Sequence, residues 1–551
     1  MSNKHAHNKK NSFFGGAAIL TAGIVAVKII GALFKIPLGN IITDAAFSDF
    51  NTAYYIYSLL IIVSTGGLPV ALSKMVSEAN AQGRGNQVKK VFRLAFTAFC
   101  ILGAVSISVM LLFPHQLAAL MNNSHSWYSI MTLAPALFFI CPLSALRGYF
   151  QGHSIMTPTA VSQTIEALCK MAIGLPLAAL LVSKGVDESI TAAGAIAGVP
   201  VGCAIGALYL FIRYRKHRAS LPEFHDKPDS SKQILSTLLK LAIPITLGSS
   251  VIALANLLDT SIIFGRLQSA AGYTEAEARL LKGVYDKALA LYNLPSAFMI
   301  PLTASVIPSV SAARAVRNYK QGAKISETAL RTTALVAFPA GVGLFSLGQP
   351  IIRLLYPSTD VALAGWLLSI LGLAAICVCF MLVCNSIMQA HQLVTIPMIT
   401  TIIGCVLKII VTYIFVGKPE INIKGGPVST LVCFGVIALL DLFIIKRTLP
   451  RSLSYVRAFL KPGLATVVMG LAAWGSYGLF SKLLVHISAF QTVTDGVATL
   501  SYTGNALSTV LAIGIAVVVY AALVILTKAI SADDLALMPK GDKIARVLHI
   551  R

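Results

Sequence analysis

Charged side chains, and carboxylates above all, are scarce in this sequence. Only 12% of its 551 residues are charged, and Asp and Glu together number 21 against 44 Lys and Arg, while 56% of residues are hydrophobic. Soluble domains of this total length need a much more polar surface, so the composition excludes them and is typical of a membrane protein. No polar stretch is long enough to hold a soluble catalytic domain.

The sequence also lacks the motifs of a nucleotide-dependent or metal-dependent enzyme. It has no Walker-type phosphate loop, no cofactor motif and no metal-ligand spacing. Its longest predicted outside loops, 265 to 283 and 482 to 504, carry no convincing pair of carboxylates or histidines. All nine cysteines, including Cys377, Cys379 and Cys384, fall in apolar segments, where they are expected to pack as small hydrophobic residues. We therefore predict a non-enzyme without cofactor or metal, and we weigh against a polytopic glycosyltransferase or ligase.

Apolar runs long enough to cross a membrane recur along the whole chain. A spanning helix needs about 20 such residues for a hydrocarbon core of about 30 Å, and it satisfies its own backbone hydrogen bonds. The first run is too long and too charged to be a removable signal peptide. The sequence predicts an all-α polytopic membrane protein with fourteen spans: 13 to 38, 47 to 76, 91 to 113, 127 to 149, 159 to 183, 190 to 212, 236 to 264, 284 to 310, 326 to 348, 361 to 389, 394 to 416, 427 to 445, 457 to 481 and 505 to 527.

Lysine and arginine gather in alternate connections between these spans. Cytoplasmic loops collect positive charge, so this distribution predicts that both termini are cytoplasmic. The largest basic cluster is RYRKHR at 213 to 218. Because the whole surplus of positive charge follows membrane orientation, we interpret this cluster as a solvated cytoplasmic loop and expect no nucleic-acid partner.

Two motifs recur between the halves of the chain. PVALSKMVSEANAQG from Pro69 matches PSVSAARAVRNYKQG from Pro308 at a shift of 239 residues, and QGHSIMTP at 151 to 158 parallels QAHQLVTIP at 389 to 397 with offsets of 238 and 239. Each half then holds six spans and has the same orientation. Transporters built this way bind their substrate near the membrane midplane between the halves, which rock to give alternating access.

The repeat predicts three parts of the chain. They are an N-terminal six-helix lobe at 1 to 218, a second six-helix lobe at 219 to 450, and two additional helices with a cytoplasmic tail at 451 to 551.

Several charged residues lie within the predicted spans, where one lysine near the bilayer centre costs about 2.5 to 3.5 kcal/mol on insertion scales. Those near span ends can extend to the interface, and the others are functional candidates. They are Lys28, Lys35, Asp49, Lys74, Glu166, Lys170, Asp259, Asp286, Lys287, Lys408 and Asp441.

Spacing relates some of these residues to one another. Lys28 and Lys35 are two helical turns apart and share a face, which we expect to turn toward a cavity, with a structural ion pair as the alternative. Glu166 and Lys170 are four residues apart, so an intrahelical pair competes with substrate contact. The adjacent Asp286 and Lys287 point to different faces and cannot neutralise one another.

Three segments resemble a known family. FNTAYYIYSLLIIVSTGGLPVALSKMVSEANAQG at Phe50 to Gly83, ALRGYFQGHSIMTPTAVSQTIEAL at Ala145 to Leu168, and YDKALALYNLP at Tyr285 to Pro295 are similar to the polysaccharide-transporter branch of the MOP superfamily. More narrowly, the whole chain resembles the MurJ-type lipid II flippases and the related stage V sporulation protein B. The resemblance implies a flippase in the bacterial cytoplasmic membrane that moves an undecaprenyl-diphosphate-linked peptidoglycan precursor, lipid II, to the outer leaflet.

The same resemblance implies site residues. Family arginines line a cationic cavity and are proposed to hold the diphosphate; Lys28 and Lys287 match two of them, and Lys35 lies one place from a third. Lysine keeps the charge but loses the planar fork that suits phosphate. The resemblance also implies that spans thirteen and fourteen form a groove in which the polyprenyl tail stays in lipid.

The remaining charged residues are candidates for ion coupling or ion pairing, with a proton or a monovalent cation as the coupling partner. They are Asp49, Glu166, Lys170, Asp259, Asp286, Lys408 and Asp441. Two alternatives remain open: a flippase for another lipid-linked oligosaccharide, and a cation or drug antiporter of the same superfamily. An antiporter for organic cations is expected to have an acidic or aromatic cavity.

Overall fold

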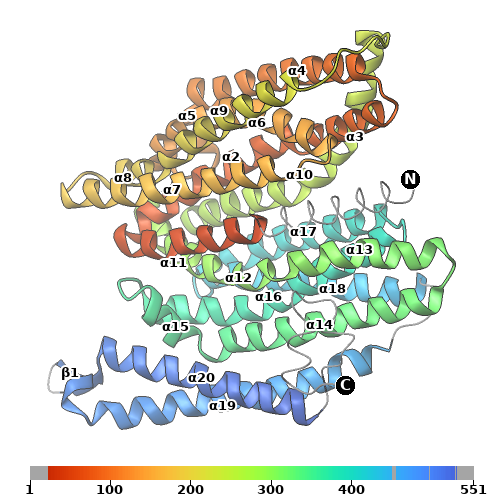
Figure 1. The fold of residues 1–551 in the computed structure, drawn as a ribbon. Coiled ribbons are helices and arrows are strands. Elements are labelled where there is room, and N and C mark those ends of the chain that lie inside the picture. The colour runs from red at the N-terminus through yellow and green to blue at the C-terminus, as the bar shows by residue number, and fades with distance from the viewer. Residues whose placement is uncertain (1–22, 449–453, 495–496, 528, 530–551) are drawn as a thin grey trace. The chain divides into compact units, whose positions relative to one another are not determined.

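The computed structural model describes residues 23–448, 454–494, 497–527 and 529, and these residues are helical almost throughout (Figure 1). Among them, 14 helical segments are long and apolar enough to cross a membrane, which confirms the predicted all-α class and number of spans. Residues 13 to 22 of the first predicted span lie outside the described residues. The chain divides into two compact units, 1–283 and 284–551, and the boundary falls within helix α11.

The first unit begins with a helix described over Gly23–Ile41. Its other elements are α2 (Asp44–Thr65), α3 (Leu68–Ala81), α4 (Gly85–Leu112), α5 (Pro114–Leu120), η1 (Ser124–Ser126), α6 (Trp127–Gly152), α7 (Thr157–Ser183), α8 (Glu188–Ile196), α9 (Gly198–Ala219) and α10 (Ser231–Ser269). Helix α10 packs on α2, α3 and α4. The sequence repeat assigns α10 to the second lobe, which is predicted to begin at residue 219. By its packing, α10 belongs to the first compact unit, which ends at residue 283.

The α2–α3 break is shaped by the glycine pair of the STGGLP segment. A Cβ atom on Gly67 would lie 2.0 Å from the carbonyl oxygen of Ala242 on α10, so no side chain fits there. The Gly67 N–H, freed by the break, donates to Thr246 Oγ1 at 3.0 Å. The second span is therefore two helices, and α10 covers the joint between them.

Helix α11 (Glu275–Tyr292) begins nine residues earlier than the predicted eighth span. The Thr274 N–H and hydroxyl both donate to Glu277 Oε2 at 2.8 Å, and the Glu277 N–H donates to Thr274 Oγ1 at 3.3 Å. This reciprocal capping box fixes a helix start that is independent of hydrophobicity. The expectation that 265 to 283 is a loop is wrong for residues 265–269, which belong to α10, and for 275–283 of α11, which include Arg279.

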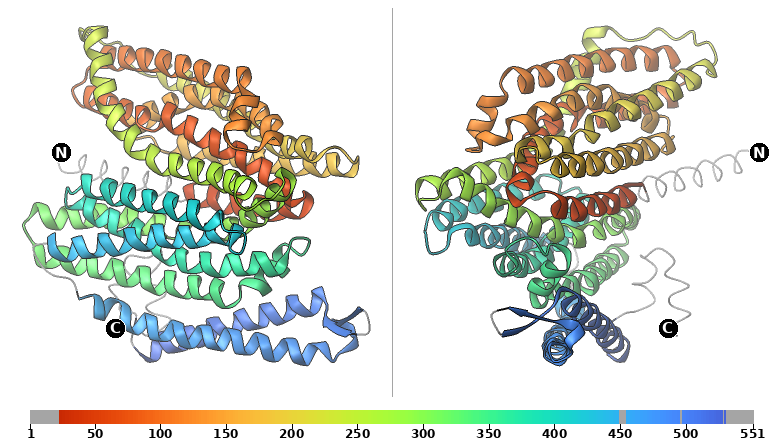
Figure 2. Two further views of the ribbon diagram at one scale, coloured as in Figure 1. Left: turned by 180° about the vertical axis from the view of Figure 1, so that it is seen from behind. Right: turned by 90° about the vertical axis from the view of Figure 1, so that its left-hand side faces the viewer.

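The second unit continues with α12 (Leu294–Ala297), α13 (Met299–Ala315), α14 (Tyr319–Ser346), α15 (Gly348–Leu355), α16 (Val361–Ala390), α17 (Thr395–Val416), η2 (Asn422–Lys424), α18 (Gly425–Thr448), α19 (Tyr455–Val485), η3 (Ser488–Phe490), β1 (Gln491–Thr494), β2 (Val497–Leu500) and α20 (Tyr502–Leu526). Helices α19 and α20 pack side by side, with the antiparallel β1–β2 pair at one end (Figures 1 and 2). Helix α19 also packs on α14. The β1–β2 pair was not predicted from the sequence.

Backbone geometry confirms one part of the internal repeat and corrects another. After α6 and α16, the turns at 153–155 and 391–393 share one hydrogen-bond pattern, and Ser154 and Gln392 have φ angles of 60° and 64°. The predicted offset of 238 residues is therefore right at this turn. After α3 and α13, the positive-φ residues are Gly83 and Arg317, an offset of 234 and not 239. The predicted match of Gly83 with Gly322 is wrong because Gly322 lies in the first turn of α14.

A clasp of polar contacts, which we call the 226–229 clasp, ties the α3–α4 turn to the segment before α10. The carboxylate of Asp226 accepts the backbone N–H groups of Asn86 and Gln87 at 2.7 and 2.9 Å. Asp229 pairs with Arg84 at 2.7 Å and accepts the Gln87 side-chain amide at 2.9 Å. Desolvation raises the pKa of Asp226, but the hydrogen bonds from the two backbone amides outweigh it, and the pKa lies below its ordinary value.

Candidate functional site

A cavity of about 420 Å³ in the first unit brings charged side chains together from three helices. Lys28 comes from the first helix, Arg147 from α6, and Glu166 and Lys170 from α7. Gln163 is a further polar lining residue. The rest of the wall is made of Ile24, Val27, Ile30, Gly31, Phe34, Tyr57, Ile61, Ile140, Ala167, Val199 and Cys203. Three cationic side chains against one carboxylate give the lining an excess of positive charge.

The carboxylate in this cavity is held by an arginine. Arg147 forms an ion pair with Glu166, and its Nε donates to Ser162 Oγ at 3.0 Å. Both side chains of the pair are mostly buried. The alternative in which Glu166 and Lys170 neutralise each other is wrong, because Glu166 turns to α6 while Lys170 turns to a cluster of aromatic rings.

Lys170 is surrounded by aromatic faces. Its Nζ lies 4.5 Å from the ring centroid of Tyr54, 4.6 Å from that of Phe34 and 5.7 Å from that of Phe50. Ring faces attract a cation, and the attraction strengthens where water is excluded. This aromatic cage explains how a lysine is tolerated within a spanning helix without a carboxylate beside it.

A row of glycines on α9 sets the position of α7. Gly198, Gly202 and Gly206 recur every four residues and so share one face of the helix. A Cβ atom on Gly202 would lie 3.0 Å from the Cα of Glu166, and one on Gly198 would lie 2.9 Å from the Cα of Lys170. Small residues let membrane helices approach closely in this way. The backbone that carries both charged residues of α7 is therefore pressed against α9.

The two lysines of the first helix have different surroundings. Lys28 is exposed and lines the cavity. Lys35 donates to Asn51 Oδ1 on α2 at 3.2 Å and is not among the lining residues. Lys74, in the middle of α3, forms an exposed i,i+4 pair with Glu78 at 3.9 Å and belongs to the surface.

Asp49 lies in a separate, buried network. Its two carboxylate oxygens accept from Arg279 Nε and Nη2 at 3.1 and 2.6 Å, and Asn123 Nδ2 donates to Oδ1 at 3.0 Å. Asp49 has no exposed surface, and Arg279 is 5% exposed. Of its two predicted roles, coupling site or ion pair, the geometry favours the ion pair.

The candidate residues of α11 are buried in the second unit. Asp286 and Lys287 are 2% and 1% exposed, and Lys287 Nζ lies 5.6 Å from the ring centroid of Tyr356. Neither residue belongs to the cavity of the first unit.

Three further candidates are also buried. Asp441 on α18 accepts the Thr400 hydroxyl of α17 at 2.8 Å, and Lys408 lies on α17. Lys408 lies 238 residues after Lys170, the same offset as between the turns at 153–155 and 391–393. Asp259 lies on α10. Within the described residues, no three His, Cys, Asp or Glu side chains gather closely enough to hold a metal ion.

Sequence reasoning missed two arginines that the structure places in ion pairs. Arg147 lies inside the fourth predicted span, within the quoted segment ALRGYFQG, so its charge in an apolar run was a usable signal. Arg279 was assigned to an outside loop, and only the Thr274 capping box placed it on a helix. Neither sequence signal identifies the carboxylate that each arginine contacts.

Known protein families and proteins with similar sequences agree with this architecture. The model of the family described as "Polysaccharide biosynthesis protein" matches residues 13–314, and the MatE model matches residues 284–414. Stage V sporulation protein B of Bacillus subtilis (strain 168) is 24% identical over 81% of this chain and 85% of its own length. Lipid II flippase MurJ of the same organism is 25% identical over 78% and 82%.

A solved structure described as lipid II flippase MurJ in an inward closed conformation shares the fold. Its TM-score is 0.69 at 17% identity, and the match covers 93% of this chain and 98% of that one. The model of the polysaccharide biosynthesis protein family matches more than half of the chain, and this match decides the family. The fourteen membrane-length helices and the segment that matches the MatE model agree with it. The chain is a MurJ-like, multi-pass membrane protein of the MOP superfamily and belongs to the polysaccharide biosynthesis protein family.

Proposed function

We propose that this protein is a flippase for a lipid-linked glycan, that lipid II is its preferred cargo, and that it works by alternating access. The observation that carries the proposal is the excess of positive charge in the cavity formed by Lys28, Arg147, Glu166 and Lys170. A diphosphate is the part of such a lipid that a bilayer rejects most strongly. A cationic, water-accessible recess gives that group a place to lose its bulk hydration.

Each cation would act differently on the diphosphate. Lys28, which is exposed, supplies a mobile ammonium at the cavity wall. Arg147 keeps donors beyond those that hold Glu166 and Ser162, because a guanidinium has five N–H groups. Its hold on Glu166 also offsets the repulsion between that carboxylate and a phosphate. Each charge-assisted contact contributes about 1.5 to 3 kcal/mol.

Lys35 and Lys287 are the other lysines that we propose as substrate contacts, as the family resemblance implies. Lys35 is held by Asn51 at 3.2 Å, so it would have to exchange that bond for a phosphate oxygen. Lys287 is buried near Tyr356 and would need a change of surroundings to reach a ligand. We therefore rank both below Lys28 as contacts of the head group.

An apolar groove in the second unit supports the proposed path for the polyprenyl tail. Its volume is about 490 Å³, and it lies between α14 and α19, the ninth and thirteenth spans. Among the described residues, its lining includes none from α20, the fourteenth span, which the family resemblance also implies for this groove. Its lining residues are Phe338, Tyr455, Val456, Phe459, Leu460, Gly463 and Leu464. An apolar chain can rest there in contact with lipid while the polar head group crosses elsewhere in the protein.

A cation or drug antiporter is the competing function, and the MatE match over residues 284–414 favours it. The cavity of the first unit argues against it, because its single carboxylate is already paired with Arg147. An organic cation entering there would meet two lysines and an arginine. A flippase for another diphosphate-linked glycan fits the same cavity, since the diphosphate is common to both cargoes.

We also propose that both termini are cytoplasmic and that the protein lies in the cytoplasmic membrane. Without a nucleotide site, the work would come from an ion gradient, the membrane potential or removal of product. The potential supplies about 2.3 kcal/mol per elementary charge per 100 mV. Asp259 and Asp441 remain our candidates for a proton or monovalent cation, because both are buried carboxylates within spanning helices. Asp49 and Glu166, which arginines hold, rank below Asp441.

The test is complementation of a strain depleted of its lipid II flippase, with lipid II quantified in each leaflet. The wild-type chain should restore growth and outer-leaflet lipid II. Lys28→Ala should lose most transport at unchanged abundance, and Lys28→Arg should retain more. Lys74→Ala is the matched control, because Lys74 is a lysine of the same unit in an exposed pair with Glu78.

The outcomes separate the alternatives. Normal flipping by a well-expressed Lys28→Ala, Lys287→Ala double variant would refute the cationic-site mechanism while leaving the family assignment intact. Growth rescue without movement of lipid II would point to another lipid-linked glycan. Failure to move any lipid-linked glycan, together with proton-dependent efflux of an organic cation, would establish the antiporter.

A further inference from the structure

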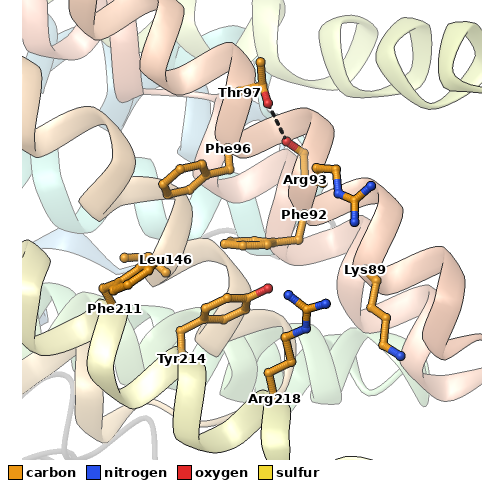
Figure 3. Close-up of a pocket in the computed structure, with 9 residues that line it drawn as sticks. All are labelled: Lys89, Phe92, Arg93, Phe96, Thr97, Leu146, Phe211, Tyr214 and Arg218. Carbon is orange, nitrogen blue, oxygen red and sulfur yellow. Dashed lines mark hydrogen bonds between the residues drawn. The ribbon is translucent and has the colours of Figure 1, made fainter. Parts of the chain in front are cut away.

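A second cavity, of about 210 Å³, lies at the ends of α4, α6 and α9 in the first unit (Figure 3). Lys89 and Arg93 stand one turn apart on α4, and Arg218 lies in the last turn of α9. The other lining residues are Phe92, Phe96, Thr97, Leu146, Phe211 and Tyr214. The lining therefore has three cationic side chains and no carboxylate.

No carboxylate among the described residues neutralises these cations. In the part of the chain that the structure describes, neither arginine nor Lys89 forms an ion pair with a carboxylate. By contrast, Arg84, Arg147 and Arg279 each have one. Like charges held around one recess repel each other, and an anion placed among them removes that cost.

The cavity has a firm aromatic wall. The ring centroids of Phe92 and Tyr214 are 4.6 Å apart, and those of Phe92 and Phe96 are 5.6 Å apart. Figure 3 shows the guanidinium groups of Arg93 and Arg218 on one side of the Phe92 and Tyr214 rings, and Phe96, Leu146 and Phe211 on the other. A basic stretch that is merely solvated needs no such wall, so the aromatic residues indicate a ligand with an apolar part.

The apolar side continues onto the outer surface of a spanning helix. Phe211 is 44% exposed, and Leu208, almost one turn earlier on α9, is 59% exposed. Large apolar side chains with this exposure on a membrane helix contact lipid chains. The cavity thus has a cationic side at the helix ends and an apolar side that leads toward the hydrocarbon.

We propose that this cavity binds the phosphate of an anionic glycerophospholipid, with phosphatidylglycerol as the ligand. Its phosphodiester would lie between Arg93 and Arg218, and its acyl chains would pass over Phe211. Basic pockets between membrane helices recognise anionic head groups in this way. A zwitterionic lipid would bring an ammonium group next to three cations, so it should bind more weakly. This site is distinct from the cavity proposed for the transported head group.

The first experiment is native mass spectrometry of the purified full-length protein titrated with phosphatidylglycerol and, in parallel, with phosphatidylcholine. Wild type should bind phosphatidylglycerol preferentially. The Arg93→Gln, Arg218→Gln double variant should bind it about tenfold more weakly or worse, as expected for the loss of charge-assisted contacts. The matched control is Arg213→Gln, Arg215→Gln, which removes the same charge from exposed positions of α9 outside the cavity.

Equal loss in the control pair would overturn the proposal, because it would show diffuse attraction. Equal binding of the two lipids would overturn it as well. Displacement of phosphatidylglycerol by millimolar inorganic phosphate would assign the cavity to a soluble anion instead. As a measurement that needs no variant, photoactivatable phosphatidylglycerol in nanodiscs should label the wild-type peptide that contains Phe211, and labelling elsewhere alone would contradict the site.

Discussion

Replacing Arg279 by methionine should destabilise the protein more than any other single change in the buried network around Asp49. Both Asp49 oxygens accept from the Arg279 guanidinium, at 3.1 and 2.6 Å, and neither residue is more than 5% exposed. Removing one partner of a buried pair leaves an uncompensated charge, which costs about 3 to 5 kcal/mol. The Asn123 amide, 3.0 Å from Oδ1, replaces only part of what is lost.

The reverse change, Asp49→Asn, should cost less. Glu188 Oε2 lies 3.8 Å from the Arg279 guanidinium and is partly exposed, so it can turn toward the charge that Asp49 leaves behind. The Asp49→Asn, Arg279→Met double variant should recover part of the loss, since replacing both members of a buried pair is often close to neutral. The structure therefore predicts an order of stability: wild type, Asp49→Asn, then Arg279→Met.

The assay is the fraction of monodisperse protein left after heating in detergent, measured by size-exclusion chromatography, beside the transport measurement. If Arg279→Met matched the thermal stability of wild type, the reasoning from burial would be refuted. If Asp49→Asn kept full stability but abolished transport, Asp49 would be a coupling residue rather than a structural one.

Three further predictions concern packing, pH and topology. Gly202→Leu should push α7 away from α9 and so lower both abundance and transport, whereas the small Gly202→Ala should be better tolerated; cross-linking of cysteines placed on α7 and α9 reports the separation. Because the folded-state pKa of Asp226 lies below its unfolded value of about 3.9, the 226–229 clasp should be fully formed above that value and lost as the pH falls through the lower folded pKa. Hydrogen exchange at the Asn86 and Gln87 amides should follow that transition, and Asp226→Asn should remove it. Reporters fused after Lys216 and Arg447 should report cytoplasm, and one within 124 to 126 should report the outside; the opposite pattern would invert the proposed topology.

The number of spans could be predicted because it depends on local sequence. A run of about 20 apolar residues is a membrane helix whatever its neighbours are, and all fourteen such runs are helical in the described residues. The parallel between QGHSIMTP and QAHQLVTIP could also be predicted, and the turns within these motifs, at 153–155 and 391–393, share one backbone geometry. Helix starts set by polar caps were missed, because hydrophobicity does not register the Thr274–Glu277 box.

The pairing of charges could not be predicted from one sequence. Four residues separate Glu166 from Lys170, and the spacing alone allows them to pair. Packing decides otherwise: the glycines of α9 set the position of α7, which carries Glu166, and Arg147 reaches it from α6. Arg147 thereby adds a third cation to the cavity. The sequence alone did not place Arg147 among the candidates, so it could not predict this excess of positive charge.

The 226–229 clasp can form only late in the synthesis of the first unit. Asn86 and Asp226 are separated by 140 residues, so the N-terminus of α4 emerges long before the carboxylate that accepts its first N–H groups. At a synthesis rate of about 5 to 20 residues per second, the interval is on the order of 10 to 30 s. During that time spans three to six enter the membrane with the α3–α4 turn still open. A nascent chain stopped before residue 226 should therefore show a protease-sensitive site at that turn, and one stopped well beyond residue 229 should not.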